Sequence, residues 1–295
     1  MNQTNCTAQA LIRLADFSLI SVTGTDRIAF LQGQLTNDVT KLADGVLMTA
    51  GYCSPKGRLL ATPRLFSVGE TVYMIVTSDQ VDVLLKRLKM FVLRSKVSLT
   101  KVEDLSVYAT FDSTVKSSLG LTFELGHAAS ELSANLDLPQ KRYLIIDKAD
   151  RQANGCSCLF KASAIAAGQT WVGAQTADQF VPQAVNLECI GGISFTKGCY
   201  TGQEIVSRVE HIGKTNRRAA VGILDTDTAP TPMTDVVNAD NKPCGCVIDS
   251  VCVNGKTVVM VQLNVGDIDN SSFKSTVNGV DLTLYNLPYA YARAQ

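Results

Sequence analysis

The sequence predicts an α+β fold that ends in a β-rich segment, and three observations carry this prediction. With 295 residues, 46% of them hydrophobic, the chain can bury a substantial core and form two or three domains. Strand-like runs are mixed with a few helical ones and do not alternate strictly, which is typical of the α+β class. From about Arg217 onward, short strand-like runs recur at regular spacing. This last segment is expected to form a small β-barrel or sandwich.

Strands and helices are both expected in the first third of the chain. Asp26–Leu35 reads as a short helix, and Ser54-Pro55-Lys56-Gly57 as a turn between two strands. Ser78 is expected to cap a second helix. One side of that helix is apolar, through Val81, Leu84, Leu85, Leu88 and Val92. Strands are expected over residues 14–22, 46–53, 58–66 and 71–77.

The rest of the chain is expected to be mostly strands, with one further helix. Thr201 and Glu204 have the spacing of a capping box, which predicts a helix from Gly202. Its apolar residues are Ile205, Val206, Val209 and Ile212, and Gly213 is its expected stop. Short strands are expected near residues 97–111, 143–147 and 161–167. Turns between the final strands are expected at Asn241-Lys242-Pro243, Asn254-Gly255 and Asn278-Gly279.

The charge balance argues against a protein built to bind nucleic acid directly. The 27 basic and 27 acidic residues give a formal net charge of +0. A basic cluster is most often a solvated helix face, but it could instead attract the polyanionic tail of a small molecule or a tRNA. Its members are Lys86, Arg87, Lys89, Arg94 and Lys96. The N-terminus does not resemble a signal peptide, and no apolar run is long enough to span a bilayer. A cytoplasmic protein with no membrane partner is expected.

Nine cysteines are present, an odd number that excludes complete intramolecular pairing. In a reducing compartment they are expected to be thiols buried as small hydrophobes. Cys156-x-Cys158 and Cys244-x-Cys246 invite a metal interpretation, but zinc sites usually have wider pair spacings. His127 and His211 lie outside any metal-ligand pairing. No metal site is expected.

The segment Lys197–Glu204, with the sequence KGCYTGQE, is the most informative stretch of the chain. Cys199 precedes a predicted helix N-terminus, where the partial positive charge and Lys197 would both favour thiolate. A functional thiol is preferred over a buried structural cysteine, while Lys197 is equally compatible with a solvated surface position. Gly198 and Gly202 would let the backbone turn sharply or approach a ligand closely.

Other polar residues near this thiol have both functional and structural interpretations. Tyr200 could face a ligand cavity or be an ordinary buried tyrosine. Gln203 and Glu204 could point into the site, although Glu204 is better explained by the capping box. Arg208 could pair with Glu204 one helical turn away.

Together with several flanking segments, this motif resembles the signature of the YgfZ family, folate-binding proteins related to the aminomethyltransferase (T-protein) of the glycine cleavage system. The segments are Val22–Asp26, Leu31–Val39, Ser54–Arg58, Phe180–Glu188, Gly191–Phe195, Lys197–Glu204 and Asn286–Tyr289. The resemblance spans nearly the whole chain. It implies a three-lobed, T-protein-like architecture with a central cavity for folate and a C-terminal antiparallel β-barrel. The implied domains are 1–45 with 115–212, then 46–114, and finally 213–295.

The resemblance also implies where folate would bind. Relatives carry tryptophans at positions that hold Phe17 and Phe160 here; phenylalanine keeps the stacking face but loses the indole N–H group. Trp171, the only tryptophan, falls at neither position. Ordinary core packing explains these three residues about as well. Further folate contacts are expected from Gln183, Asn186, Tyr200 and Gln203, although turn formation or capping is an alternative for Asn186.

Two departures from the parent enzymes bear on catalysis. At the two positions where aminomethyltransferases have carboxylates, this chain has Leu84 and Ala166. Asp79 and Asp82 are close in sequence to the first of these positions but do not align with it. Losing both aligned carboxylates would remove acid–base and pterin-anchoring groups. A classical aminomethyltransferase is therefore not expected.

The preferred hypothesis is a protein that binds tetrahydrofolate or a derivative and carries a functional thiol, Cys199, facing the cavity or its entrance. The resemblance implies that it supports assembly or repair of iron-sulfur enzymes, and thereby tRNA modification. Iron-sulfur tRNA-modifying enzymes are the expected partners. The alternatives are a tetrahydrofolate-dependent aminomethyltransferase or demethylase, and a metal or iron-sulfur carrier built on the two Cys-x-Cys pairs.

Overall fold

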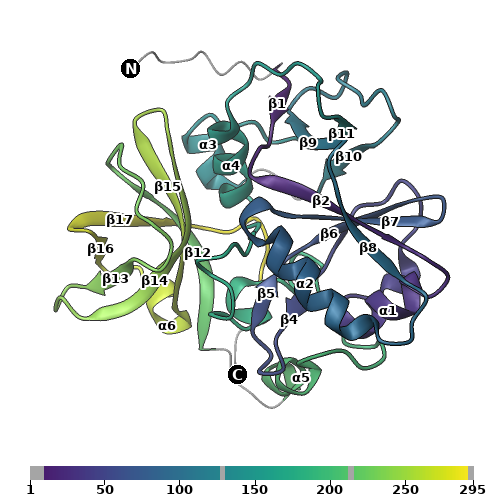
Figure 1. Ribbon diagram of the computed structural model, residues 1–295. Coiled ribbons are helices and arrows are strands. Elements are labelled where there is room, and N and C mark those ends of the chain that lie inside the picture. Colours follow the sequence, from purple (N-terminus) through teal and green to yellow (C-terminus); the bar gives the residue numbers. More distant parts are fainter. Residues whose placement is uncertain (1–9, 127–129, 212–215, 292–295) are drawn as a thin grey trace.

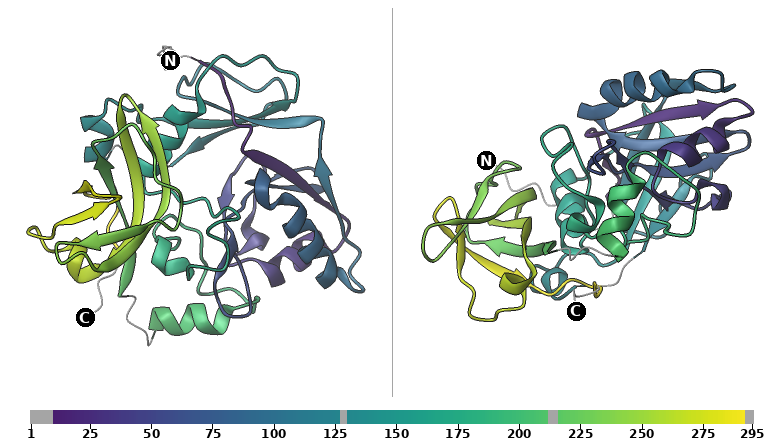
Figure 2. Two further views of the ribbon diagram at one scale, coloured as in Figure 1. Left: turned by 60° about the vertical axis from the view of Figure 1, so that its left-hand side comes forward. Right: turned by 90° about the horizontal axis from the view of Figure 1, so that it is seen from below.

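The computed structural model describes residues 10–126, 130–211 and 216–291, and these form three lobes (Figure 1). Two lobes are built on antiparallel sheets with helices, and the third is a closed β-barrel. This arrangement confirms the predicted α+β class, the three-lobed architecture and the C-terminal barrel. Figure 2 shows the barrel standing to one side of the two sheet-containing lobes. None of the helices in these ranges is both long and apolar enough to cross a bilayer.

The first lobe is a five-stranded antiparallel sheet with the order β3-β6-β7-β2-β8. Alternate residues of β2 face opposite sides, so that Ile20 packs with the apolar faces of α1 and α2, while Leu19 packs toward the second lobe. A two-stranded sheet, β4-β5, lies in the same part of the chain. The elements are β2 (Phe17–Thr23), α1 (Arg27–Gln34), β3 (Met48–Thr49), β4 (Tyr52–Cys53), β5 (Leu59–Ala61), β6 (Arg64–Val68), β7 (Thr71–Thr77), α2 (Val81–Val92) and β8 (Ser98–Val102), with short 3-10 helices at Val39–Lys41 and Ser78–Gln80.

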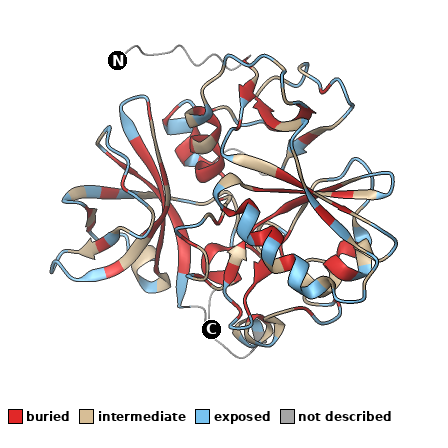
Figure 3. Ribbon diagram, viewed as in Figure 1, coloured by how far each residue is buried: buried red, intermediate tan, exposed pale blue. Residues whose placement is uncertain are grey.

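The second lobe is a four-stranded sheet with the order β1-β9-β11-β10, accompanied by α3 and α4. Helix α4 is buried over most of its length, because it lies between this lobe and the barrel (Figure 3). The elements are β1 (Ile12–Arg13), β9 (Leu105–Thr110), β10 (Thr122–Leu125), α3 (Glu131–Asn135), β11 (Arg142–Lys148) and α4 (Ser157–Ala166). A 3-10 helix at Pro182–Val185 and α5 (Gln203–His211) follow in the chain, and α5 lies away from this sheet, beside β4 (Figure 1).

The third lobe closes into a six-stranded barrel with the order β12-β15-β14-β13-β16-β17. Two Asn-Gly pairs make its tight hairpins, with positive φ at both residues: 52° and 75° at Asn254-Gly255, and 51° and 79° at Asn278-Gly279. Both predicted hairpins are therefore confirmed. The elements are β12 (Arg217–Leu224), β13 (Asp235–Asn238), β14 (Pro243–Val253), β15 (Lys256–Asn264), α6 (Val265–Ile268), β16 (Ser275–Val277) and β17 (Val280–Tyr285).

The hydrogen-bonded sheets cross one of the predicted domain boundaries. Strand β2 is paired between β7 and β8, and α1 shares a hydrophobic core with them. Residues 17–42 therefore belong with residues 46–102, whereas the resemblance had suggested that residues 1–45 group with 115–212. The first strand, β1, does pair outside this lobe, with β9.

Several predicted elements are confirmed and others are corrected. Thr71–Thr77 is a strand with those bounds, and the helices expected at Asp26 and Gly202 begin one residue later. The prediction of a strand at residues 161–167 is wrong: this alanine-rich run lies almost entirely in α4, and alanine is the best helix former. Ser78 caps no helix, because its hydroxyl bonds to Ser18 and the Ala15 carbonyl instead. His127, and the expected helix end at Ile212 and Gly213, lie outside the described residues.

Candidate functional site

A cavity of about 630 Å³ lies where the three lobes meet. The first lobe supplies the start of β2 and the end of β7, the second supplies α4 and the segment after it, and the barrel supplies β14. The lining residues are Leu14, Asp16, Phe17, Thr77, Ser78, Asp79, Ser157, Cys158, Phe160, Lys161, Ala164, Ile165, Gln169, Trp171, Gly173, Gln175, Thr176, Pro232, Ile248, Asp249 and Val251. The volume is in the range of small-molecule and cofactor sites.

Aromatic rings form part of the cavity wall. Phe17 and Trp171 make an edge-to-face pair, with ring centroids 4.4 Å apart. Phe160, on α4, also lines the cavity. Behind Trp171, the buried Arg64 guanidinium lies 4.2 Å from the ring centroid and is held by the carbonyls of Thr62 and Thr170. Burial, together with the nearby charge of Arg142, lowers the pKa of Arg64 to about 9.

Charged groups lie at several points of the same wall. Asp79 accepts a 2.8 Å hydrogen bond from the Ala174 amide, which fixes its carboxylate at the cavity. Lys161 and Asp249 form an ion pair between α4 and β14, with Nζ and Oδ1 2.7 Å apart. Burial raises the pKa of Asp249, and Lys161 opposes that shift. Apolar faces with a few convergent charges suit a flat, hydrogen-bonding heterocycle that carries an anionic group.

The segments that define the sequence motif meet at a different place. Thr36 donates to the Gly192 carbonyl at 2.6 Å, and Asn37 donates to that of Gly191 at 2.8 Å. The Ser54–Gly57 turn lies against the start of α5, since a Cβ on Gly202 would lie 2.5 Å from the Ser54 carbonyl oxygen. Segments from four parts of the sequence thus form one tightly bonded assembly. None of the described residues that line the cavity belongs to it.

Lys197 holds this assembly together. Its ammonium donates to the carbonyls of Gln32 and Leu35, each at 2.6 Å, and to that of Asn37 at 2.9 Å. The carbonyls of Gln32 and Leu35 belong to the C-terminal end of α1, where a cation is favoured, and Asn37 lies just beyond it. Burial lowers the pKa of Lys197 to about 8. The side chain is buried, so it is not the solvated surface lysine of the alternative interpretation, and its donors are directed at the backbone.

Cys199 is an exposed free thiol four residues before α5. The sulfur is exposed, and Cys199 is not among the described residues that line the cavity. Gly202 has φ +84°, as its predicted role in a sharp turn requires. Gly198 has open space where a Cβ would lie and is not among the glycines with positive φ, so neither reason for glycine applies there.

The predicted capping box is not formed within the described part of this segment. No hydrogen bond links Thr201 to Glu204; instead the Glu204 carboxylate accepts a 2.8 Å bond from Arg208. The predicted i,i+4 pair is therefore confirmed, and it explains why this carboxylate does not return to the helix start.

Four residues expected to contact folate lie elsewhere among the described residues. Gln183 donates to the Val206 carbonyl at 2.8 Å, and Asn186, in the left-handed conformation, donates to that of Ala219 at 2.9 Å. Tyr200 is buried against Lys197, and Gln203 begins α5. These contacts join the motif assembly to the barrel. Of the predicted folate-binding residues, only Phe17 and Phe160 line the cavity.

Sequence reasoning did not assign the charged residues of the cavity wall, which are Asp16, Asp79, Lys161 and Asp249. Trp171, for which core packing and ligand contact were equally compatible, lines the cavity and packs directly on Phe17. Asp79 does not align with the carboxylate of aminomethyltransferases, yet it lines the cavity. No sequence motif marks Lys161 as a cavity residue. The presence of a single tryptophan was the one sequence feature that could have pointed to Trp171.

The chain has a fold like that of aminomethyltransferase T. The glycine cleavage system aminomethyltransferase T from Bartonella henselae matches with a TM-score of 0.65 over 98% of this chain and 88% of that chain, at 13% identity. No protein-family model matches the chain. An uncharacterised protein of Haemophilus influenzae is 31% identical, over 95% of this chain and 98% of its own length. The tRNA-modifying protein YgfZ of Yersinia pseudotuberculosis is 30% identical, over 96% of this chain and 93% of its own length.

The chain therefore belongs to the YgfZ family. A YgfZ protein of Yersinia pestis is similar to the same extent, again at 30% identity over 96% of this chain. Four of the segments that carry the resemblance meet in the motif assembly: Leu31–Val39, Ser54–Arg58, Gly191–Phe195 and Lys197–Glu204.

Proposed function

We propose that this protein binds tetrahydrofolate or a derivative in the cavity between its lobes and supports tRNA modification in the cytoplasm. Folate binding is supported by the aromatic wall of Phe17, Trp171 and Phe160, which lines a cavity of about 630 Å³. The role in tRNA modification is supported by the relatives named tRNA-modifying protein YgfZ. Iron-sulfur enzymes that modify tRNA are the proposed clients.

The cavity offers a partner for each part of a folate. The aromatic rings would contact the pterin and aminobenzoyl faces. Asp16 and Asp79 would accept hydrogen bonds from the pterin N–H groups, and Lys161 is the cation available in the lining for a glutamate carboxylate. Because Lys161 is already paired with Asp249, the glutamate carboxylate would either share Lys161 with Asp249 or replace Asp249 as its partner.

Cys199 is proposed to act on a partner at the surface and not on the folate. It is exposed, and the assembly that presents it is separate from the cavity lining. A Cys199→Ala variant should therefore keep its tetrahydrofolate affinity while failing to complement a deletion of its own gene. Normal complementation by this variant would remove the thiol from the function.

Isothermal titration calorimetry with tetrahydrofolate under anaerobic conditions tests the cavity assignment. Phe17→Ala should weaken binding about tenfold, since an aromatic contact contributes about 1 kcal/mol beyond the area it buries. Phe91→Ala, at an exposed position on α2 away from the lining, is the matched control and should bind normally. Equal affinities for the two variants, or no heat of binding to the wild type, would contradict the assignment.

Folate-dependent one-carbon transfer is the second candidate, favoured by one observation. Asp79 and Asp16 keep carboxylates on the cavity, although Leu84 and Ala166 replace those expected from the parent enzymes. Production of methylene-tetrahydrofolate from candidate amines would identify this activity. Loss of that product in Asp79→Asn would assign the carboxylate to it.

A further inference from the structure

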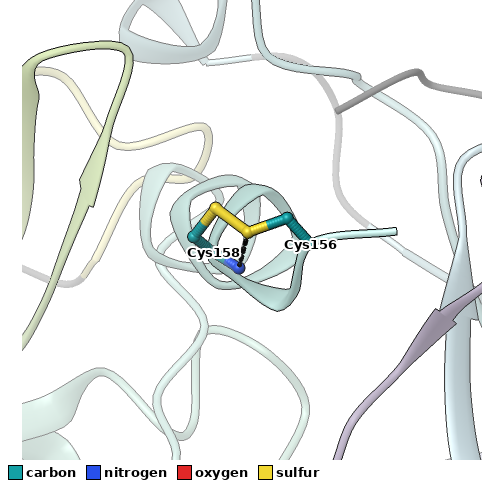
Figure 4. The surroundings of a disulfide bond; sticks show 2 residues. All are labelled: Cys156 and Cys158. Carbon is teal, nitrogen blue, oxygen red and sulfur yellow. Dashed lines mark hydrogen bonds between the residues drawn. A yellow bond between two sulfur atoms is a disulfide. The ribbon is translucent and has the colours of Figure 1, made fainter. Parts of the chain in front are cut away.

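Two Cys-x-Cys pairs are described, and they differ in oxidation state. Cys156 and Cys158 are joined by a disulfide, with Cα atoms 5.4 Å apart (Figure 4). Cys244 and Cys246 have the same spacing but are free thiols. Cys244 packs into the barrel core, while Cys246 packs against the core shared with α4, so the two side chains belong to different clusters. The prediction that the Cys-x-Cys cysteines are thiols is therefore wrong for the first pair, which is a disulfide.

The disulfide lies at the start of α4 and at the wall of the cavity. Cys156 is the N-cap residue, and its sulfur accepts a hydrogen bond from the Cys158 amide, with N and Sγ 3.4 Å apart. Cys158 lines the cavity together with Ser157 and Lys161 of the same helix. Both cysteines are partly exposed. A small molecule in the cavity would thus contact the Cys158 side of the disulfide.

We infer that Cys156–Cys158 is a thiol–disulfide exchange site that takes a small thiol or dithiol at the cavity. This inference rests on the disulfide, its place at the cavity wall and its place at a helix N-terminus; it does not depend on folate binding. Neither the motif assembly nor the exposed Cys199 takes part in it.

The chemistry balances with an external thiol as the reductant. Its thiolate attacks Cys158 Sγ, forming a mixed disulfide and breaking the bond to Cys156. Cys156 leaves as a thiolate, which the Cys158 amide and the positive end of α4 stabilise. A second thiol attacks the mixed disulfide, releases the oxidised small molecule and leaves Cys158 reduced. Two electrons and two protons pass from the two thiols to the cysteine pair, and an external disulfide reverses the sequence.

Differential alkylation of the folded wild-type protein tests whether the pair reacts. Free thiols are first blocked with N-ethylmaleimide, dithiothreitol is added, and the newly released thiols are labelled with iodoacetamide and located by mass spectrometry. We expect the second label on Cys156 and Cys158, and on neither Cys244 nor Cys246. Labelling of the first pair by N-ethylmaleimide before reduction, or its release only after denaturation, would overturn the inference.

Trapping the mixed disulfide tests which sulfur is attacked. The oxidised wild-type protein, with its free thiols blocked, is treated briefly with reduced glutathione and quenched with N-ethylmaleimide before peptide mapping. Glutathione should be found on Cys158, with the maleimide on Cys156, at least tenfold more often than the reverse. Cys244→Ser is the matched control and should give the same distribution. Equal amounts of the two products would contradict attack at Cys158.

Discussion

At the residue scale, Lys197 fixes the loop that presents Cys199. Its ammonium donates hydrogen bonds to three backbone carbonyls at and just beyond the end of α1. The Tyr200 ring centroid lies 5.1 Å from its Nζ atom. The side chain is thus committed to the protein backbone. Its effect on Cys199 is one of position, since it connects the loop to a helix that is distant in the sequence.

Replacing Lys197 with methionine should destabilise the protein. Methionine keeps much of the aliphatic volume but leaves the buried carbonyls unpartnered, so we expect a loss of about 2 kcal/mol in the free energy of unfolding. Urea denaturation measures this change. Lys41→Met is the matched control, because Lys41 is largely exposed in its pair with Asp38 and should change stability by less than about 0.5 kcal/mol. Similar losses in both variants would argue against the anchoring role.

The two glycines of the motif should respond differently to alanine. Gly202 has φ +84°, and a Cβ there would meet the Ser54 carbonyl oxygen at 2.5 Å, so Gly202→Ala should lose about 1–3 kcal/mol of stability. Gly198 has open space, and Gly198→Ala should stay within about 0.5 kcal/mol of the wild type. Thermal unfolding of the two variants side by side makes the comparison. Tolerance of alanine at Gly202 would contradict the close packing of this turn.

Predictions for single residues were correct where they depended only on residues close in the sequence. The T-G-Q-E run and the apolar residues after it indicated a turn followed by a helix, and the Glu204–Arg208 pair followed from helical spacing. The roles of Lys197 and Gln183 could not be predicted, because their partners lie in α1 and α5 and only the fold brings them together. Nor could spacing alone show that one Cys-x-Cys pair is oxidised and the other is not.

At the element scale, Asp147 ties strand β11 to the loop before β10. Its carboxylate accepts from the amide and hydroxyl of Ser118, at 2.8 and 2.5 Å, and pairs with Arg151. Burial alone would raise the pKa of Asp147, but these hydrogen bonds outweigh it and lower the pKa to about 2. The folded state therefore favours the ionised carboxylate.

This lowered pKa predicts acid sensitivity that depends on one residue. The stabilisation, about 2 kcal/mol, is complete above the unfolded-state pKa near 4 and is lost as the pH falls toward 2. Asp147→Asn removes the titrating group, so the stability difference between wild type and variant should be largest at pH 6 and shrink below pH 4. Urea denaturation midpoints from pH 6 to pH 2.5 test this. A difference that stays constant over that range would assign no such stabilisation to Asp147.

Element prediction was most reliable for strongly patterned segments. The apolar spacing of α2 and the Asn-Gly hairpins of the barrel depend on neighbouring residues alone, and both were confirmed. Residues 161–167 were misassigned because α4 is buried on nearly all sides and shows no amphipathic period. The first lobe includes β2 because of long-range pairing with β7 and β8, which no local pattern records.

At the scale of the whole molecule, the cavity exists only because three lobes meet. Phe17 and Trp171 come from distant parts of the sequence, and residues of β14 in the barrel complete the lining together with α4. The sequence resemblance predicted such a cavity and two of its aromatic residues. It could not separate the residues that line the cavity from those of the motif assembly, because both belong to the same resemblance.

The fluorescence of Trp171 during a tetrahydrofolate titration tests the central claim most directly. Trp171 is the only tryptophan, and it lies in the cavity wall against Phe17, so its emission reports on that space alone. We expect saturable quenching in the wild type and the same dissociation constant in Cys199→Ala, because the thiol lies outside the lining. Unchanged emission at saturating tetrahydrofolate, or quenching that requires Cys199, would contradict a folate cavity separate from the thiol.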